Sequence, residues 1–176
     1  MIHRGIEFAV QAHGEQKRKG SEIPYIVHPF ETALILAQAG ADQKLVCAGL
    51  LHDTLEDTAI TYEQLEQEFG TEVADLVQGR SEDKSQTWEV RKSTTISNIK
   101  HLTYDGKLLI CADKLSNMRS IAADYRQIGE ELWKRFRRGK QSQEWYYGEI
   151  IRELAELELL PMYQELKRLY FSVFSK

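Results

Sequence analysis

The stretch Leu45-Val-Cys-Ala-Gly-Leu-Leu-His-Asp-Thr-Leu-Glu-Asp57 decides the fold. Its first seven residues would be apolar on nearly every side of a helix, which is typical of a helix buried in a protein core. We therefore predict a central helix over residues 43–56, with Asp42 as its N-cap. The pairs His52-Asp53 and Glu56-Asp57 interrupt this apolar surface. Because a buried carboxylate is unfavourable without a partner, these groups require hydrogen bonds, counter-charges or a cation.

A second apolar run, Leu108-Leu-Ile-Cys-Ala, is interrupted in the same way by Asp113. It predicts another buried helix over residues 107–123, which follows a turn at Asp105-Gly106. We expect Asp113 to approach the acidic and imidazole groups of the central helix from this second helix.

A third polar group, His28, stands beside Pro29 at the start of a predicted helix over residues 28–38. Proline suits the first turn of a helix, where its missing N–H donor is not needed. Imidazoles and carboxylates from three separate stretches suit a single divalent cation such as manganese, iron, magnesium or zinc. The absence of thiolates from the set argues against a structural zinc and favours a catalytic site.

The rest of the sequence also has helical patterns and few breakers. Thr61 and Gln64 predict a capping box for a helix that ends at Gly70, and Thr71 is the expected cap of the helix after it. A polar loop is expected over residues 79–86, and further helices over 2–13, 71–77, 87–101 and from 129 onward, interrupted near Pro161. We expect an all-α fold, a compact helical bundle.

We further expect one domain over residues 1–176, with the metal-site core over about 2–123 and C-terminal helices over about 129–174. The 23 basic and 27 acidic residues give a net charge of −4 without long blocks of one sign. This balance does not indicate a nucleic-acid or membrane partner. Oligomeric state stays open.

The sequence indicates a cytoplasmic protein. Cys47 and Cys111 lie in apolar surroundings without CxxC spacing, as buried thiols do in a reducing compartment. The segment Met1–Ala12 contains an acidic residue and no long apolar run, so it is neither a signal peptide nor a membrane span.

Three blocks in order carry a family resemblance: His28 in Tyr-Ile-Val-His-Pro, His52-Asp53 in Leu-Leu-His-Asp-Thr-Leu-Glu-Asp-Thr, and Asp113 in Ala-Asp-Lys-Leu-Ser-Asn. This order resembles the HD superfamily, and more narrowly the hydrolase half of RelA/SpoT-type alarmone enzymes and their stand-alone small relatives. The resemblance extends over residues 2–120 and is looser in the C-terminal third. It implies an HD-domain helical bundle that acts as a manganese-dependent (p)ppGpp 3′-pyrophosphohydrolase, with a metal-activated water as nucleophile.

The resemblance also implies roles for individual residues. The family's metal ligands match His28, His52, Asp53 and Asp113, and the acidic pair that orients or deprotonates the attacking water matches Glu56 and Asp57. Contacts to a small-molecule nucleotide are implied for Arg18, Lys19 and Asn117, and Lys84 is a further candidate for a phosphate contact.

Two segments depart from the long bifunctional enzymes. The loop between Lys19 and Pro24 differs in length, and Gly79-Arg-Ser-Glu-Asp-Lys84 stands where those enzymes have a Thr-Lys containing segment. A synthetase half is not expected. Two alternatives therefore stay open, an HD phosphohydrolase that acts on another nucleotide and a non-catalytic nucleotide-binding module. The basic segment Lys134–Lys140 is either a substrate-side patch or ordinary surface.

Overall fold

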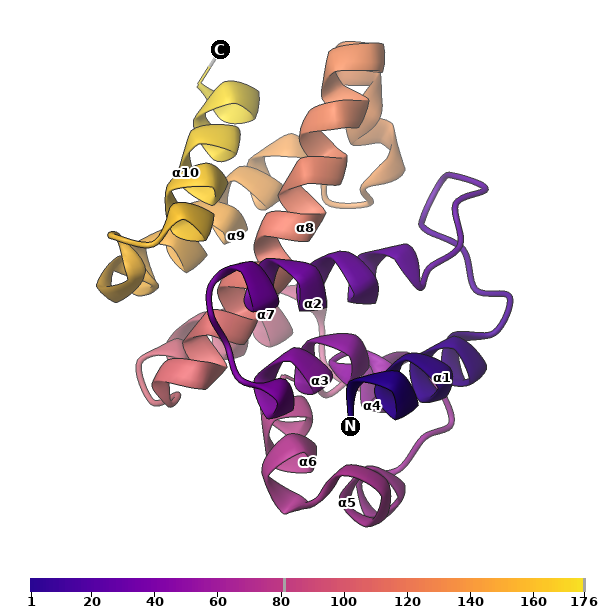
Figure 1. Cartoon of the computed structure of the whole chain (residues 1–176). Coiled ribbons are helices and arrows are strands. Elements are labelled where there is room, and N and C mark those ends of the chain that lie inside the picture. The colour runs from indigo at the N-terminus through magenta and orange to yellow at the C-terminus, as the bar shows by residue number, and fades with distance from the viewer. Residues whose placement is uncertain (81, 176) are drawn as a thin grey trace.

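The computed structural model describes residues 1–80 and 82–175, and in these ranges all regular structure is helical (Figure 1). The only pairing of β type in these ranges is an isolated bridge between Lys17 and Pro24. The expected all-α fold is confirmed. The predicted loop over 79–86 contains Ser81, which lies outside the described residues. The helices are α1 (Ile2–His13), α2 (Val27–Gln38), α3 (Gln43–Leu51), α4 (Thr54–Asp57), α5 (Tyr62–Phe69), α6 (Thr71–Gln78), α7 (Trp88–Ile99), α8 (Tyr104–Ile128), α9 (Gly139–Glu153) and α10 (Pro161–Phe174), with 3-10 helices η1 (Gly129–Arg135) and η2 (Ala155–Leu157).

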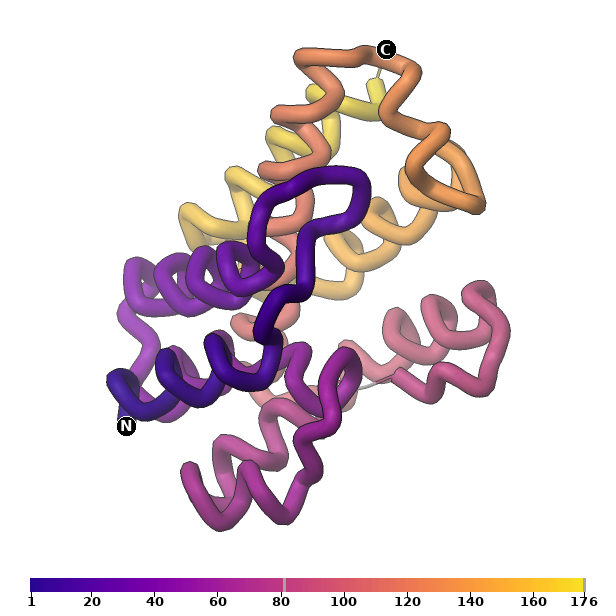
Figure 2. The backbone as a smooth tube through the Cα atoms, turned by 90° about the vertical axis from the view of Figure 1, so that its right-hand side faces the viewer, coloured from indigo at the N-terminus to yellow at the C-terminus, as the bar shows by residue number. Residues whose placement is uncertain are grey.

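Two helices form the centre of the molecule, as their apolar sequences require. The short α3 packs against α1, α2 and α6, while the long α8 packs against α2, α10 and η1. Figure 2 shows the loop over residues 14–26 rising beside α8 and the segment that follows it. The bundle therefore brings α2, the end of α3 and the middle of α8 together, and these three places carry His28, His52 and Asp113.

A glycine on α3 allows the close approach of α2. A Cβ atom on Gly49 would lie 2.7 Å from Leu36 Cδ1 and 3.2 Å from the backbone Cα of Ala33. A larger residue here requires Leu36 to rotate away and the Ala33 backbone to shift by a few tenths of an ångström. The same two helices carry the imidazoles of His28 and His52 at or next to their ends.

The predicted helix over 43–56 is wrong in one respect, because it is broken after Leu51. The side chain of Thr54 donates a 2.7 Å hydrogen bond to the carbonyl of Leu51, and a new helix, α4, begins at Thr54. A threonine hydroxyl that bonds to a local carbonyl competes with the helical pattern in this way. His52 and Asp53 therefore lie at a bend between two helices, and their angular spacing is not that of a continuous helix.

Two other expectations need correction. The predicted turn at Asp105-Gly106 is instead the first turn of α8, because Thr103 caps that helix by accepting a hydrogen bond from the Gly106 N–H. The predicted cap at Thr71 is also wrong, since Gly70 precedes α6 and the Thr71 hydroxyl donates to Glu66.

Other local expectations are confirmed. Thr61 and Gln64 form the capping box of α5, and Pro161 occupies the first turn of α10. Among the described residues, no helix has both the length and the apolar character needed to cross a membrane.

Candidate metal centre

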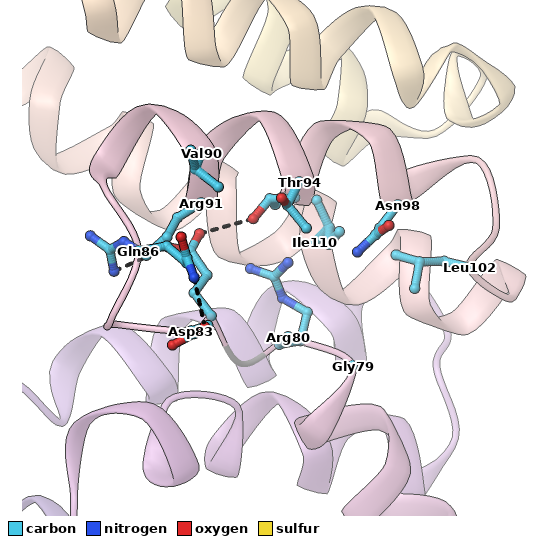
Figure 3. Close-up of a pocket in the computed structure, with 12 residues that line it drawn as sticks. Gly79, Arg80, Asp83, Gln86, Val90, Arg91, Thr94, Asn98, Leu102 and Ile110 are labelled. Atoms are coloured by element: carbon cyan, nitrogen blue, oxygen red, sulfur yellow. Dashed lines mark hydrogen bonds and ion pairs between the residues drawn. The ribbon is translucent and has the colours of Figure 1, made fainter.

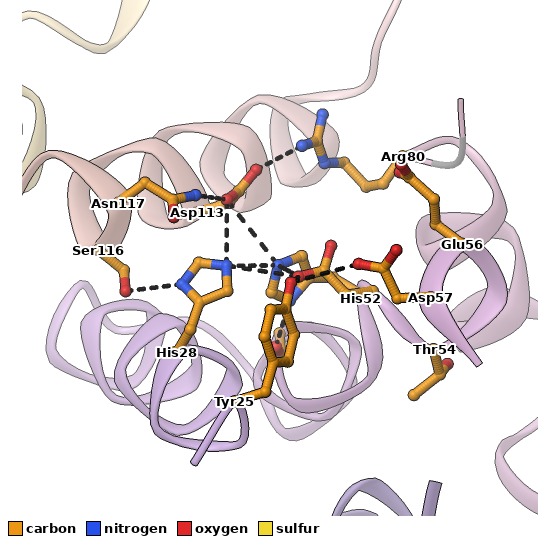
Figure 4. A network of polar contacts seen from close by, with 12 residues as sticks. Tyr25, His28, His52, Thr54, Glu56, Asp57, Arg80, Asp113, Ser116 and Asn117 are labelled. Atoms are coloured by element: carbon orange, nitrogen blue, oxygen red, sulfur yellow. Dashed lines mark hydrogen bonds and ion pairs between the residues drawn. The ribbon is translucent and has the colours of Figure 1, made fainter. Parts of the chain in front are cut away.

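Four polar side chains from three parts of the chain meet in the interior (Figure 4). His28 Nε2 lies 3.1 Å from His52 Nε2 and 3.4 Å from Asp113 Oδ1. One ligand atom from each of these three buried residues lies within 4.8 Å of the other two. Asp53 Oδ2 lies 3.1 Å from His52 Nε2 and 3.5 Å from His28 Nε2, so its carboxylate adjoins the same point.

The Nδ1 atoms of both imidazoles are hydrogen-bonded to groups outside the cluster. His52 Nδ1 lies 2.9 Å from the Gly49 carbonyl, and a carbonyl can only accept a hydrogen bond. His28 Nδ1 lies 2.8 Å from Ser116 Oγ, whose own proton goes to the Glu31 carboxylate. Both Nδ1 atoms therefore carry a proton, and both Nε2 atoms point inward, where a neutral imidazole presents a lone pair.

Two unprotonated Nε2 atoms 3.1 Å apart repel each other, so this arrangement fits a cation between or beside them. A proton on one imidazole relieves the repulsion. Burial lowers the pKa of His52, but the negative charge of Asp53 raises it, and the net shift is upward. A divalent cation supplies more positive charge to the same two nitrogens and two carboxylates. Histidine ligands that donate their other N–H to a protein acceptor are the usual arrangement at metal sites.

Asp113 is held by donors on both of its oxygens. Oδ2 accepts from Arg80 Nη2 at 2.5 Å and lies 2.9 Å from Lys114 Nζ, while Oδ1 accepts from Asn117 Nδ2 at 2.7 Å. Burial alone would raise the pKa of Asp113, but Lys114, His28 and Arg80 hold it well below its usual value. The carboxylate is ionised and oriented, with Oδ1 toward the imidazoles.

Tyr25 holds the second carboxylate. Its hydroxyl donates to Asp53 Oδ2 at 2.6 Å and lies 3.4 Å from Asp57 Oδ2. Burial and the charge of Asp53 together raise the pKa of Tyr25, so the phenol keeps its proton. Tyr25 thereby links the histidine and aspartate cluster to the acidic pair on α4.

Glu56 and Asp57 lie next to the cluster, and a lysine bridges them. Lys84 Nζ donates at 2.6 Å both to Asp57 Oδ1 and to the backbone carbonyl of Glu56. The Glu56 side chain is directed toward Arg91, 3.9 Å away. Burial raises the pKa of Glu56, and the negative charges of Glu82, Asp57 and Asp53 raise it further. A carboxylate whose pKa is raised toward neutrality is suited to accept a proton.

A cleft with a volume of about 680 Å³ opens beside the metal centre. This volume lies within the range of small-molecule sites. Arg18 lines the cleft and donates a 2.8 Å hydrogen bond to Asn117, which in turn contacts Asp113. Lys19 also lines the cleft, but its ammonium lies over the Phe136 ring rather than at the metal centre. Lys84 reaches the acidic pair from another loop.

Arg80 separates the metal centre from a small pocket of about 100 Å³ between the loop after α6 and helix α7 (Figure 3). The side chains of Arg91, Thr94 and Asn98 form the opposite wall. Arg80 thus connects a metal-centre carboxylate with the segment in which the chain departs from the long bifunctional enzymes.

Sequence reasoning did not find four of these contacts. Tyr25 had a usable signal, because it lies three residues before His28 in a loop that must return to α2. Ser116 and Lys114 also had one, as polar residues beside Asp113 in an apolar helix. Arg80 had none, since a single basic residue after a helix is usually exposed.

The fold and the site together define a helical domain with a buried cluster of imidazoles and carboxylates that suits a divalent cation. The family model described as HD domain matches residues 5–138, and the chain belongs to that family. Members of this family use a divalent metal.

Three proteins illustrate what the chain is similar to. It is 41% identical over 119 residues to the guanosine-3′,5′-bis(diphosphate) 3′-pyrophosphohydrolase MESH1 of Danio rerio, which is 66% of either chain. It is 41% identical over 123 residues to the guanosine-3′,5′-bis(diphosphate) 3′-pyrophosphohydrolase of Aquifex aeolicus, 68% of this chain and 18% of that protein. The solved structure of a metazoan ortholog of SpoT that hydrolyzes ppGpp superposes with a TM-score of 0.80 and 26% identity, over 97% of this chain and 93% of the other.

Proposed function

We propose that this protein is a (p)ppGpp 3′-pyrophosphohydrolase, which converts ppGpp and water to GDP and pyrophosphate. One observation carries the proposal. Four side chains that suit a divalent cation meet beside a cleft, next to a pair of carboxylates that Lys84 and Arg91 approach. The names of the relatives supply the substrate, and the chain spans 66% or less of the first two of them.

The metal ligands are His28, His52, Asp53 and Asp113, and we propose Mn²⁺ as the ion. Mixed imidazole and carboxylate ligands suit several divalent ions, and the choice of manganese among them follows from the resemblance to the alarmone hydrolases. When bound, such an ion lowers the pKa of water and neutralises charge on a phosphoryl oxygen.

The acidic pair on α4 handles the proton of the attacking water. Glu56, whose pKa is raised by burial and by Glu82, accepts the proton, and Asp57 orients the water from its position beside the Tyr25 hydroxyl. The water oxygen forms a bond to the phosphorus attached to ribose O3′, the bond from that phosphorus to O3′ breaks, and O3′ takes up a proton. Lys84 holds the Asp57 carboxylate in place through its 2.6 Å hydrogen bond.

The nucleotide occupies the cleft. Arg18, fixed by its hydrogen bond to Asn117, and Lys19 supply positive charge along one wall. An anionic ligand of this size is favoured by such a wall. The departures around Arg80 and Lys84 favour testing other nucleotides in parallel.

The test is an incubation of purified protein and Mn²⁺ with ppGpp, with GDP and pyrophosphate measured by anion-exchange chromatography. Equimolar GDP and pyrophosphate are expected, and chelation of the metal should abolish both. Glu56→Ala should lower turnover by at least about a hundredfold, the contribution of one general-base group. Asp53→Ala should lower turnover at least as much, because it removes a proposed metal ligand. If a panel of other phosphorylated nucleotides is cleaved while ppGpp is not, the substrate assignment is wrong. If nothing is cleaved but ppGpp binds, the protein is a nucleotide-binding module.

The proposed cellular setting is the cytoplasm. Cys47 and Cys111 are buried thiols, and burial raises their pKa values to about 11 and about 12. Neutral thiols in a core are stable in a reducing compartment. We propose a nucleotide as the ligand, without nucleic acid or membrane partners.

A further inference from the structure

The cleft beside the metal centre continues along α8 well beyond the ligands. Its lining includes Asn117, Ser120, Asp124 and Gln127, which follow one face of that helix. At 1.5 Å per residue, the 11 positions from Asp113 to Asp124 correspond to about 16 Å along the helix axis. A ligand that fills this cleft therefore has one end at the metal centre and another end far from it.

The far end of the cleft is built by a basic side chain from η1. Arg135 Nη1 lies 2.8 Å from Asp124 Oδ2, and the pair anchors the guanidinium at the end of α8. Lys19 lies beside it, with its ammonium 5.5 Å from the centre of the Phe136 ring. Gly20 has a positive φ of 72°, and a Cβ atom there would lie 3.1 Å from Arg135 Cδ, so the loop passes directly over this arginine.

Three other basic residues near Arg135 pair with carboxylates outside the cleft. Lys134 pairs with Glu131, Arg138 pairs with Glu89 and Lys140 pairs with Glu130. Of the basic segment Lys134–Lys140, the residues that line the cleft are Arg135 and Phe136. The segment therefore contributes one directed cation to the cleft instead of a diffuse basic surface.

The charges at the far end favour an anion. Lys19 and Arg135 carry two positive charges there against the single negative charge of Asp124. A guanidinium has five N–H donors, and its bond to Asp124 uses one of them. The remaining donors suit the oxygens of a phosphate group, which a guanidinium binds through charge-assisted hydrogen bonds.

We propose that Arg135, beside Lys19, binds a second phosphate group of the nucleotide, on the 5′ side of the ribose. Arg135 then selects nucleotides that carry phosphates on both the 3′ and the 5′ side over those that carry a 3′-diphosphate alone. This inference rests on the proposed function for the position of the 3′-diphosphate at the metal centre. It assigns a specificity role to a residue outside the motifs of the resemblance.

The test compares two substrates, ppGpp and guanosine 3′-diphosphate, which lacks the 5′ phosphates. In Arg135→Gln, KM for ppGpp should rise about 10- to 100-fold, the effect of one charge-assisted hydrogen bond. The kcat for ppGpp and both constants for guanosine 3′-diphosphate should stay at their wild-type values. Arg135→Lys, which keeps the charge, should recover part of the loss.

Lys134→Gln is the matched control, because it removes the same charge from the neighbouring position outside the cleft. It should leave both substrates unaffected. The proposal is overturned if Arg135→Gln leaves KM for ppGpp unchanged, or if it weakens both substrates equally, which is the result of a purely structural role.

A failure of the proposed function is recognised separately. If wild-type protein cleaves neither substrate, calorimetric titration with ppGpp and with guanosine 3′-diphosphate replaces the kinetics. The selectivity of Arg135 then stands if ppGpp binds more tightly and Arg135→Gln removes the difference. The proposed selectivity is overturned if ppGpp and guanosine 3′-diphosphate bind with the same affinity.

Discussion

The Arg80 guanidinium donates a 2.5 Å hydrogen bond from Nη2 to Asp113 Oδ2, and both side chains are almost fully buried. Lys114 lies at 2.9 Å from the same oxygen. A carboxylate of the metal centre is thus neutralised by protein groups independently of any cation. The site can be formed and oriented without a metal, and a cation bound on the Oδ1 side would act on the carboxylate from the side opposite the guanidinium.

The first prediction concerns Arg80→Met, which keeps most of the side-chain volume and removes the charge. The metal-free protein should lose about 3 kcal/mol of unfolding free energy, the lower end for a broken buried pair, because Lys114 stays near Asp113. Added Mn²⁺ should raise Tm more in the variant than in the wild type, since the ion then supplies the missing counter-charge. Differential scanning fluorimetry with and without Mn²⁺ measures this.

Arg91→Met is the control for that experiment. Arg91 pairs with Glu82 and approaches Glu56, and these contacts are remote from the Asp113 carboxylate. Its Mn²⁺-dependent gain in Tm should match that of the wild type. An equal or smaller gain in Arg80→Met would show that the guanidinium does not substitute for the metal charge.

The second prediction concerns the serine that orients His28. Ser116→Ala removes the acceptor of the His28 Nδ1 proton and the link to Glu31. Loss of such a supporting hydrogen bond weakens metal affinity by about 10- to 100-fold. Isothermal titration with Mn²⁺ should show this loss, while Ser172→Ala on α10, whose hydroxyl bonds only a local carbonyl, should not. Unchanged affinity in Ser116→Ala would mean that His28 does not need this partner.

The third prediction uses the pKa of Glu56, which burial and then the charge of Glu82 raise above the ordinary value of 4.5. If Glu56 is the base, kcat/KM falls as pH drops through this raised pKa, because the carboxylate becomes protonated. Glu82→Gln removes a negative charge, so the pKa of Glu56 falls and the acidic limb of the profile moves to lower pH. Thr95→Val, which removes a hydrogen bond to Glu82 without changing its charge, should leave the limb in place. If Glu82→Gln does not move the acidic limb of the kcat/KM profile, Glu56 is not the titrating group.

Part of this picture could be predicted from the sequence, for a physical reason. Ionisable residues inside apolar helical runs are costly, so His52 and Asp113 signalled a shared buried site before any coordinates. Periodicity also placed α1, α2 and the buried faces of α3 and α8. The assignment of His28, His52, Asp53 and Asp113 as ligands stays a prediction, supported by the way the fold brings them together.

Other features depend on single local contacts that periodicity does not detect. The bend after Leu51 depends on the Thr54 hydroxyl, and the early start of α8 depends on the Thr103 cap, although Gly106 resembles a breaker. The contact of Arg80 with Asp113 joins residues 33 positions apart and requires the tertiary fold. Such contacts are visible only once the helices are packed.

The fourth prediction concerns the close approach of α2 and α3 at Gly49. An alanine is favoured over glycine inside a helix by about 1 kcal/mol, so Gly49→Ala would stabilise α3 if space were available. Space is not available, because the new Cβ would lie 2.7 Å from Leu36 Cδ1 and 3.2 Å from Ala33 Cα. The Leu36 side chain can rotate away, but the Ala33 backbone can only move together with α2.

We therefore expect Gly49→Ala to lower the unfolding free energy by about 1–3 kcal/mol, the range for overpacked cores. Movement of α2 also displaces His28 from His52, so Mn²⁺ affinity should fall in the same variant. Gly79→Ala is the control, because its Cβ would lie at an ordinary distance of 3.4 Å from the Asp75 carbonyl. Urea unfolding and Mn²⁺ titration measure both effects. If Gly49→Ala is less stable but binds Mn²⁺ normally, Leu36 alone absorbs the methyl group, and the spacing of α2 and α3 does not control the metal centre.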